Sequence, residues 1–398
     1  MARAILNGVN PYLPLPKLAE QWISGSGFFQ LNHPTPHPPA VGLLSLPFGL
    51  LIYETSALLW LFFELLCLLA SVCLILRWWE VELKPWTVIA TFLFILGWGP
   101  ITDDLWYGQL NSCLLLLLLC GWFALRAGSN AAGGAFIGGM VTLKLAAWPI
   151  VLFLALRRRW SGVLVSASTI FTIHLGAIIV VGSAVVKDYY FNIGPSVSSV
   201  YRGYENNFST WTLGGRLFAE FRHNFVTLPL WSDPSLAQLL TYLVPAGFLV
   251  FGLALAMKAK QFDTSFGILV IVGILVNPIA WNHYLVLALI PIIIAVRRIG
   301  AMETPQVMAI AMFVIYIILC IPPGARVAAT LLFSRQTTSN GIAVVPLWAG
   351  GITLLPAIAV LGIILILWKT DRVALPQLLQ INVDEGRERV SEIAATRV

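Results

Sequence analysis

The sequence predicts an all-α polytopic membrane protein, a bundle of transmembrane helices that includes one re-entrant hairpin. Of its 398 residues, 59% are hydrophobic and only 11% are charged, a composition that excludes an ordinary water-soluble domain. Runs such as SALLWLFFELLCLLASVCLILRWW are apolar on every helix face and long enough to cross about 30 Å of hydrocarbon. Strands of a transmembrane barrel would alternate apolar and polar residues instead.

Nine apolar stretches are expected to span the membrane, and basic residues stand at their ends. The stretches are 55–77, 86–100, 110–126, 162–184, 236–257, 264–280, 283–296, 305–321 and 342–368. The net charge of +6 therefore orients the protein in its membrane and does not indicate a nucleic-acid partner. Residues 1–370 are expected to form one transmembrane domain, and 371–398 a cytoplasmic tail.

The segment near 131–156 has basic residues at both ends and one lysine, Lys144, in its middle. A single crossing would place either Arg126 or the triplet Arg157–Arg159 on the wrong side of the membrane. Two short helices that meet near Thr142–Ala147 keep both basic groups on the cytoplasmic side. Lys144 would then lie deep in the bilayer, facing a cavity open to the exterior, where it could bind an anion. The alternative is a lysine that snorkels or pairs with a nearby carbonyl.

The stretch GPITDDLWYGQLNS lies between two predicted spans and is the first of three polar stretches expected on the exterior side. Asp103 and Asp104 precede Gln109 and Asn111 at the mouth of the next helix. Adjacent carboxylates beside amides can accept a proton and hold hydroxyl groups. An equally weighted alternative is that the two aspartates cap the positive end of that helix.

Two further stretches are expected on the same side. Residues 187–235 form a long exterior loop rich in aromatic residues and amides, which suits a sugar or a lipid phosphate, although an interfacial aromatic belt is the better explanation for most of these rings. The stretch ILVNPIAWNHYLVLALIP contributes His283, a candidate general base or phosphate donor; a histidine bonded to backbone is the alternative.

No metal or cofactor is predicted. His33 and His37 share the spacing of some metal ligands, but the intervening prolines favour an extended turn and neither a cysteine nor a carboxylate stands near them.

Six motifs, in this order, resemble glycosyltransferase family 87: NGVNPY, HPPAVGLLSLPFGLL, YGQLN, GGMVTLKLAAWP ending in RRRW, NNFSTWTLGGRLF and NPIAWNHY. The resemblance runs from about residue 4 to residue 296. It implies the C-type glycosyltransferase fold and an inverting transfer of a hexose, with mannose expected, from a polyprenyl-phosphate donor to a glycolipid or glycan acceptor on the extracytoplasmic side of the cell membrane.

The implied mechanism needs a base for the acceptor hydroxyl and cations for the phosphate that leaves. Lys144 is the first candidate for the phosphate site, and Arg216 with Asn207 and Ser209 of NNFSTWTLGGR is the second. Asp103, Asp104 and His283 are the catalytic candidates, while Gln109 and Asn111 would hold the sugar.

The sequence also departs from this family. Members usually carry a transmembrane helix and an acidic residue, a candidate base, before the stretch that matches ARAILNGVNPY, so both would lie upstream of Met1. We therefore expect a longer native chain, a base such as Asp104, or a non-catalytic family member. A transporter or flippase of lipid-linked sugars is the competing function, because it would share the polytopic build and the lysine in the cavity.

Overall fold

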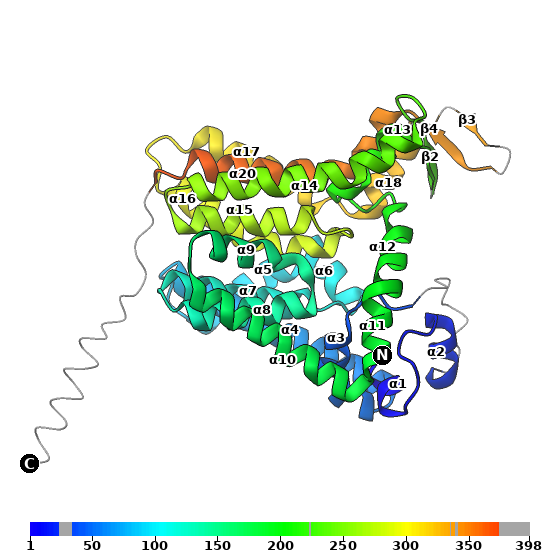
Figure 1. Ribbon diagram of the computed structural model, residues 1–398. Coiled ribbons are helices and arrows are strands. Elements are labelled where there is room, and N and C mark those ends of the chain that lie inside the picture. Colours follow the sequence, from blue (N-terminus) through cyan, green and yellow to red (C-terminus); the bar gives the residue numbers. More distant parts are fainter. Residues whose placement is uncertain (24–33, 223, 335, 339–340, 374–398) are drawn as a thin grey trace, which may run out of the picture.

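The computed structural model describes residues 1–23, 34–222, 224–334, 336–338 and 341–373 (Figure 1). It is the all-α polytopic architecture that the sequence predicts. Within the described residues, five helices are long and apolar enough to span a membrane, and two bent helix pairs raise the number to seven if each pair is one span. The expected count of nine spans and the division at residue 370 stay predictions.

Every described element in the first half of the chain is a helix. Its elements are α1 (Ala2–Leu6), α2 (Leu15–Trp22), α3 (Pro39–Ser45), η1 (Leu46–Leu50), α4 (Tyr53–Trp78), α5 (Pro85–Leu96), α6 (Gly99–Trp106), α7 (Asn111–Arg126), α8 (Asn130–Leu143), η2 (Leu145–Ala147), α9 (Trp148–Leu156) and α10 (Trp160–Val181).

The second half continues the bundle and adds a small sheet at one end. Its helices are α11 (Ser183–Asp188), η3 (Tyr189–Ile193), α12 (Gly194–Arg202), η4 (Thr210–Thr212), α13 (Leu213–Phe218), α14 (Pro234–Lys258), α15 (Phe262–Leu275), η5 (Asn282–Ala288), α16 (Leu289–Gly300), α17 (Gln306–Cys320), α18 (Pro323–Leu331), α19 (Leu347–Gly350), η6 (Gly351–Leu354) and α20 (Leu355–Lys369). The strands are β1 (Phe221–Arg222), β2 (Phe225–Thr227), β3 (Gln336–Thr337) and β4 (Ala343–Val345), in the order β1-β2-β4-β3, and only the β2–β4 pair is parallel among them.

Helices α8 and α9 enter the bundle and return to the side from which they came. The guanidinium of Arg159, just after α9, donates to the carbonyl of Leu125 at 3.2 Å and to the side chain of Asn130 at 3.3 Å. Both ends of the segment therefore meet beside the end of α7. Glycines let α8 lie directly on α10, since a Cβ at Gly134 would stand 2.2 Å from the Gly162 carbonyl oxygen.

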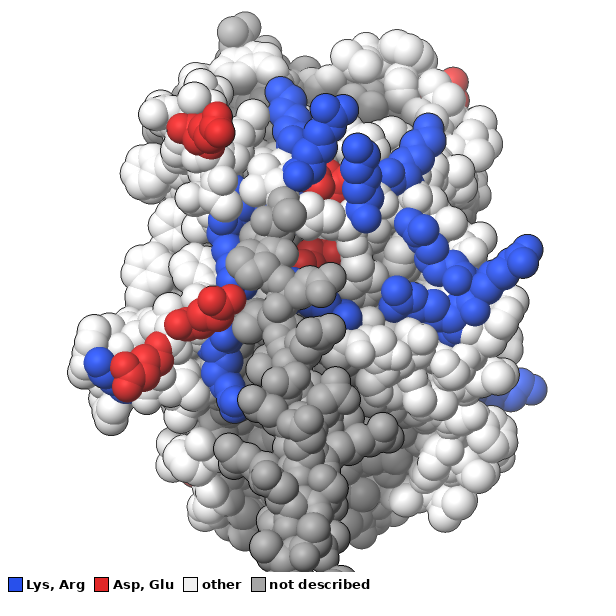
Figure 2. Space-filling view, turned by 90° about the vertical axis from the view of Figure 1, so that its left-hand side faces the viewer, with Lys and Arg blue, Asp and Glu red and all other residues white. Residues whose placement is uncertain are grey.

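Charged side chains gather on one face of the molecule, at the ends of the spanning helices (Figure 2). We call this the basic face and define it by Arg126, Arg157, Arg159 and Arg297, whose contacts connect neighbouring helix ends. Ion pairs and backbone contacts tie its helices together: Arg126 pairs with Asp263 at 3.3 Å, and Arg157 donates to the Met257 carbonyl at 2.9 Å.

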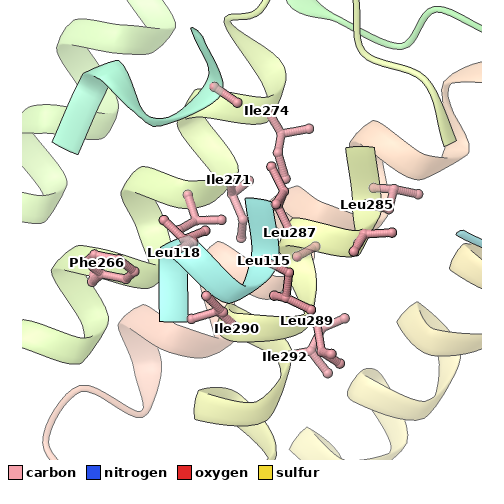
Figure 3. Close-up of a cluster of buried hydrophobic side chains, with 14 of the residues drawn as sticks. Leu115, Leu118, Phe266, Ile271, Ile274, Leu285, Leu287, Leu289, Ile290 and Ile292 are labelled. Atoms are coloured by element: carbon pink, nitrogen blue, oxygen red, sulfur yellow. The ribbon is translucent and has the colours of Figure 1, made fainter. Parts of the chain in front are cut away.

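The core lies where α7, α15 and the η5–α16 segment meet (Figure 3). Leu115, Phe266, Ile271 and Ile290 are among its fully buried side chains. Helix α15 is buried from Asp263 to Leu275, so it contacts protein on every side. This packing fixes the positions of α7 and η5, which carry the polar residues described below.

Three expected elements differ from the observed ones. The stretch expected as a span at 86–100 ends early and bends by 78° into α6, so Asp103 and Asp104 lie on a helix and not in a loop. The span expected at 305–321 continues after an 86° bend as α18. The described residues between 187 and 235 include helices and strands where a long loop was expected. In each place a proline at the first or second helical position starts a new helix at a new angle.

Candidate functional site

Lys144 marks the break between α8 and η2, at the tip of the hairpin. Its backbone is extended, with φ −161° and ψ 126°, and its N–H still donates to the Met140 carbonyl at 2.8 Å. Fourteen residues of α8 place it about 20 Å from the basic face. Gly273 of α15 permits the tip to approach, because a Cβ there would lie 1.8 Å from the Ala146 carbonyl oxygen.

The ammonium group of Lys144 is held by two neighbours. It donates to Oδ1 of Asn111 at 3.0 Å and lies 3.6 Å from the centroid of the Tyr284 ring. The side chain is 8% exposed, and its partner Asn111 is fully buried. An ammonium has three N–H donors, so these two contacts leave capacity for an additional acceptor such as a phosphate oxygen.

Asp104 is occupied by the start of α7. Its Oδ1 accepts from the backbone N–H of Asn111 at 3.2 Å and from the side-chain amide at 2.6 Å, and its Oδ2 accepts from the backbone and the hydroxyl of Ser112, both at 3.1 Å. The carboxylate therefore caps the positive end of the helix, the alternative that the sequence left open. By holding Asn111, Asp104 also positions Lys144.

Asp103 points to a different set of partners, from the second half of the chain. Its Oδ2 accepts from the side-chain amide of Asn282 at 2.6 Å. The guanidinium of Arg326, a fully buried residue of α18, donates to the Ile321 carbonyl at 2.7 Å and to Asn282 at 3.4 Å. Sequence reasoning did not single out Arg326, although an arginine in the apolar stretch PPGARVAATLL is a signal that could have found it.

His283 follows Asn282 and is buried among aromatic rings. Its ring centroid lies 6.3 Å from that of Tyr107, 5.8 Å from Trp281 and 5.1 Å from Tyr284. Because Tyr284 also carries the Lys144 ammonium, the histidine and the lysine belong to one cluster. Gln109, by contrast, contributes its backbone: its N–H donates to the Asp104 carbonyl at 2.9 Å, and its carbonyl accepts from Trp60 at 3.4 Å.

The second candidate for the phosphate site lies apart from Lys144. Its residues Arg216, Asn207 and Ser209 hold the chain after α12 against the stretch 275–282. The buried Arg216 donates to the Glu205 and Asn207 carbonyls at 2.7 and 3.1 Å and to the Thr353 hydroxyl at 3.0 Å. Burial lowers the pKa of its guanidinium to about 10, so the group stays charged at neutral pH. Asn207 accepts from the Ala280 N–H at 3.0 Å, and Ser209 donates to the Pro278 carbonyl at 3.3 Å.

Glu64, which sequence reasoning missed, completes the cluster from α4. It is 1% exposed, and its Oε2 accepts from the backbone N–H of Cys113 at 3.2 Å. Asp104 and Glu64 thus meet the same helix start, the first turn of α7. A glutamate inside an otherwise apolar span is the same kind of signal as Lys144 and could have been found by it.

His37 approaches this cluster from the N-terminal region. Tyr12 donates to its carbonyl at 3.0 Å, and Tyr189 donates to the preceding carbonyl of Pro36 at 2.7 Å. Burial and the positive charge of Lys144 lower the pKa of the His37 imidazole to about 3, so it is neutral at physiological pH. His33 lies outside the described residues. Among those that are described, no group of three or more His, Cys, Asp or Glu side chains is arranged to hold a metal ion.

A cavity of about 920 Å³ lies beside the cluster, between the N-terminal helices, α4 and the turn from α6 to α7. His37, Glu64 and Tyr107 contribute to its wall, which is otherwise mostly apolar. The volume is that of a site for a small molecule or a lipid headgroup with part of its chain.

Comparison with known proteins identifies the family of this chain. The sequence profile of glycosyltransferase family 87 matches residues 36–278, more than half of the chain. The chain belongs to glycosyltransferase family 87. The family 87 match includes Glu64, Asp103, Asp104, Asn111 and Lys144 and ends before Asn282.

Curated relatives match a shorter part of this family 87 chain. It is 28% identical over 145 residues to the alpha-(1->3)-arabinofuranosyltransferase of Mycobacterium tuberculosis and 31% identical over 138 residues to that of Mycolicibacterium smegmatis. These matches cover 36% and 33% of the chain and 34% and 32% of the relatives, so the chain spans about a third of their length. No solved structure matches it.

Proposed function

We propose that the protein transfers a sugar from a polyprenyl-phosphate donor to a hydroxyl group of a glycolipid or glycan acceptor, with inversion at the anomeric carbon. The observation that carries the proposal is the ammonium of Lys144, held at the tip of a re-entrant hairpin with donor capacity left over. A cation at this depth favours an anion that enters with its lipid chain in the membrane.

In the proposed reaction, the acceptor hydroxyl attacks the anomeric carbon and the lipid phosphate departs. The negative charge that grows on the departing phosphate is stabilised by Lys144, which Asn111 and Tyr284 hold in place before the reaction begins. Asp103 and His283 stay candidates for a catalytic role toward the acceptor hydroxyl. Arg216, Asn207 and Ser209 stay candidates for a phosphate contact, although their bonds to backbone support a role in holding the loop.

The position of the basic face supports an extracytoplasmic reaction. If that face is cytoplasmic, as positively charged loops favour, the hairpin tip lies toward the opposite side and its substrates reach it from there. The proposed location is a cell membrane, crossed several times by the chain.

The sugar that is transferred can be decided by direct comparison of two donors. The family resemblance predicts a hexose, with mannose first, whereas the matched relatives are named as arabinofuranosyltransferases. The purified protein in lipid nanodiscs should be given radiolabelled polyprenyl-phosphate mannose and polyprenyl-phosphate arabinofuranose separately, each with octyl glycoside acceptors. Transfer from either donor supports glycosyl transfer and identifies the sugar.

The same protein in sealed vesicles tests the competing flippase function. Movement of a labelled donor across the bilayer with no glycosylated product from either sugar would contradict the proposal. A product that is formed with inverted anomeric configuration, determined by nuclear magnetic resonance, would support it.

A further inference from the structure

Glu64 has one carboxylate oxygen that the fold does not use. Its Oε2 accepts from Cys113, but its Oε1 is buried and has no hydrogen-bond partner, a situation shared by no other carboxylate oxygen among the described residues. A buried acceptor left without a partner costs about 1–3 kcal/mol, and more if it is charged. The fold tolerates this cost at a place where a ligand could supply the missing donor.

The cavity offers a route by which such a donor could arrive. Its wall includes Glu64 at one place and strongly exposed apolar side chains at others: Trp106 is 85% exposed and Leu58 is 66% exposed. Leu58 lies on α4 two turns before Glu64, on a helix long enough to span the membrane. A molecule with an apolar chain and a hydroxylated head fits a cavity of this chemistry, with the chain at Leu58 and the head near Glu64.

Glu64 also lies close to the group that is proposed to hold the phosphate. It bonds to the third residue of α7, Cys113, while Lys144 bonds to the first, Asn111. The first turn of α7 therefore contacts both the carboxylate and the ammonium. An acceptor hydroxyl and a donor phosphate held by these two groups would be neighbours.

Resting on the proposed glycosyl transfer, we propose that Glu64 is the catalytic proton acceptor and that the cavity holds the lipid-linked acceptor. The hydroxyl proton passes to Oε1 of Glu64 as the hydroxyl oxygen forms its bond to the anomeric carbon. The bond from that carbon to the phosphate oxygen breaks, and its electron pair leaves with the phosphate, beside Lys144. Glu64 then releases the proton to water in the cavity.

The two aspartates are less suited to this role. Each of the two carboxylate oxygens of Asp104 accepts two hydrogen bonds from the start of α7. One oxygen of Asp103 is bonded to Asn282, and Asp103 does not belong to the cavity wall. Glu64 combines an unpartnered oxygen with a position at the cavity.

The test uses a nucleophile that needs no base. In Glu64→Gln, we expect kcat for transfer to an octyl glycoside to fall by about 10²- to 10⁴-fold, with the KM of the donor unchanged. Azide is already an anion, so formation of the glycosyl azide from the same donor should proceed in this variant at the wild-type rate. Glu20→Gln, an exposed residue outside the cavity wall, is the matched control and should keep both activities.

Each result decides the assignment. Full hydroxyl transfer by Glu64→Gln would overturn it, and so would an equal loss of azide and hydroxyl transfer, since that pattern indicates a structural residue. If Glu64→Gln does not fold, Glu64→Asp should retain base-dependent transfer at a reduced rate, and loss of the acid limb of its pH profile would overturn the proposal. A wild-type protein that glycosylates neither nucleophile would refute the proposed function itself.

The acceptor's place in the cavity has its own variant. Ala57→Trp fills the cavity from α4 and should raise the KM of the octyl glycoside several-fold without changing azide transfer. A raised KM of the donor instead would show that the cavity holds the donor's lipid chain and would overturn this part of the proposal.

Discussion

Replacing Lys144 by methionine removes the ammonium group but keeps most of the side chain's apolar length. In the folded protein this deletes the 3.0 Å hydrogen bond to Asn111 and the 3.6 Å contact with the Tyr284 ring. It also removes a buried positive charge from the cluster in which Asn111 joins Lys144 to Asp104. The variant therefore tests both the phosphate site and the charge balance of the cluster.

The expected loss can be worked from these contacts. Removing one preorganised donor from a charge that develops in the transition state costs about 2.7–4 kcal/mol, which is a factor of about 10² to 10³ in kcat. Losing the hydrogen bond from this charged donor to the buried Asn111 can in addition cost about 1.5–3 kcal/mol of stability. Folding must therefore be measured first, by thermal unfolding in detergent, and kcat expressed per folded molecule.

The assay is transfer from a polyprenyl-phosphate sugar in nanodiscs at saturating acceptor. We expect kcat of Lys144→Met to be lower by about 10² to 10³ per folded molecule. Lys187→Met, which removes an exposed lysine of α11, should be unaffected. Wild-type kcat in folded Lys144→Met protein would refute the reasoning, because the ammonium would then do nothing for the leaving phosphate.

Three other predictions concern folding. Gly134→Ala should lower the free energy of unfolding by about 1–3 kcal/mol, because its Cβ would stand 2.2 Å from the Gly162 carbonyl oxygen. Gly139→Ala is the control, since its Cβ would meet open space and should leave the stability unchanged. Equal melting temperatures of the two variants would contradict the close packing of α8 on α10. His37 stays neutral in the folded protein down to about pH 3, because its pKa is lowered to about 3, whereas in the unfolded chain it binds a proton below about pH 6.5. The free energy of unfolding should therefore fall as the pH drops from about 6.5 to about 3, by at most about 1.4 kcal/mol per pH unit. His37→Gln should flatten that pH dependence, and an unchanged slope would exclude His37 as its source. Arg216→Met should lower the melting temperature, since it leaves the Glu205 and Asn207 carbonyls without their donor; a normal melting temperature with a raised KM of the donor would instead favour the phosphate contact.

The hairpin was predictable because its signals are local. Basic residues before and after an apolar segment decide on which side each end lies, and the break at Lys144 follows from the length between them. The structure confirms the return of the segment through the bonds of Arg159 to Leu125 and Asn130.

The composition of the site was predictable only in part. Asp104, Asn111 and Lys144 are joined in the structure, and Asp103 is joined to Asn282 beside His283. Their connection depends on the 78° bend between α5 and α6, which tertiary packing determines and hydropathy alone does not reveal.

Glu64 and Arg326 were missed for a related reason. Each lies within a segment whose apolar character predicts only that it is buried or faces lipid. Which neighbour a single charged residue meets there depends on how helices far apart in the sequence pack together, as α4 meets α7 at Cys113. A charge inside an apolar helix can be recognised as a site candidate from sequence, but its partner cannot.

The most direct test of the central claim is a structure of the protein in nanodiscs with a non-hydrolysable polyprenyl-phosphonate sugar. The claim predicts a phosphonate oxygen within about 3 Å of the Lys144 ammonium, with the lipid chain leading into the membrane. A phosphonate bound at Arg216, or elsewhere with Lys144 still contacting only Asn111 and Tyr284, would contradict it.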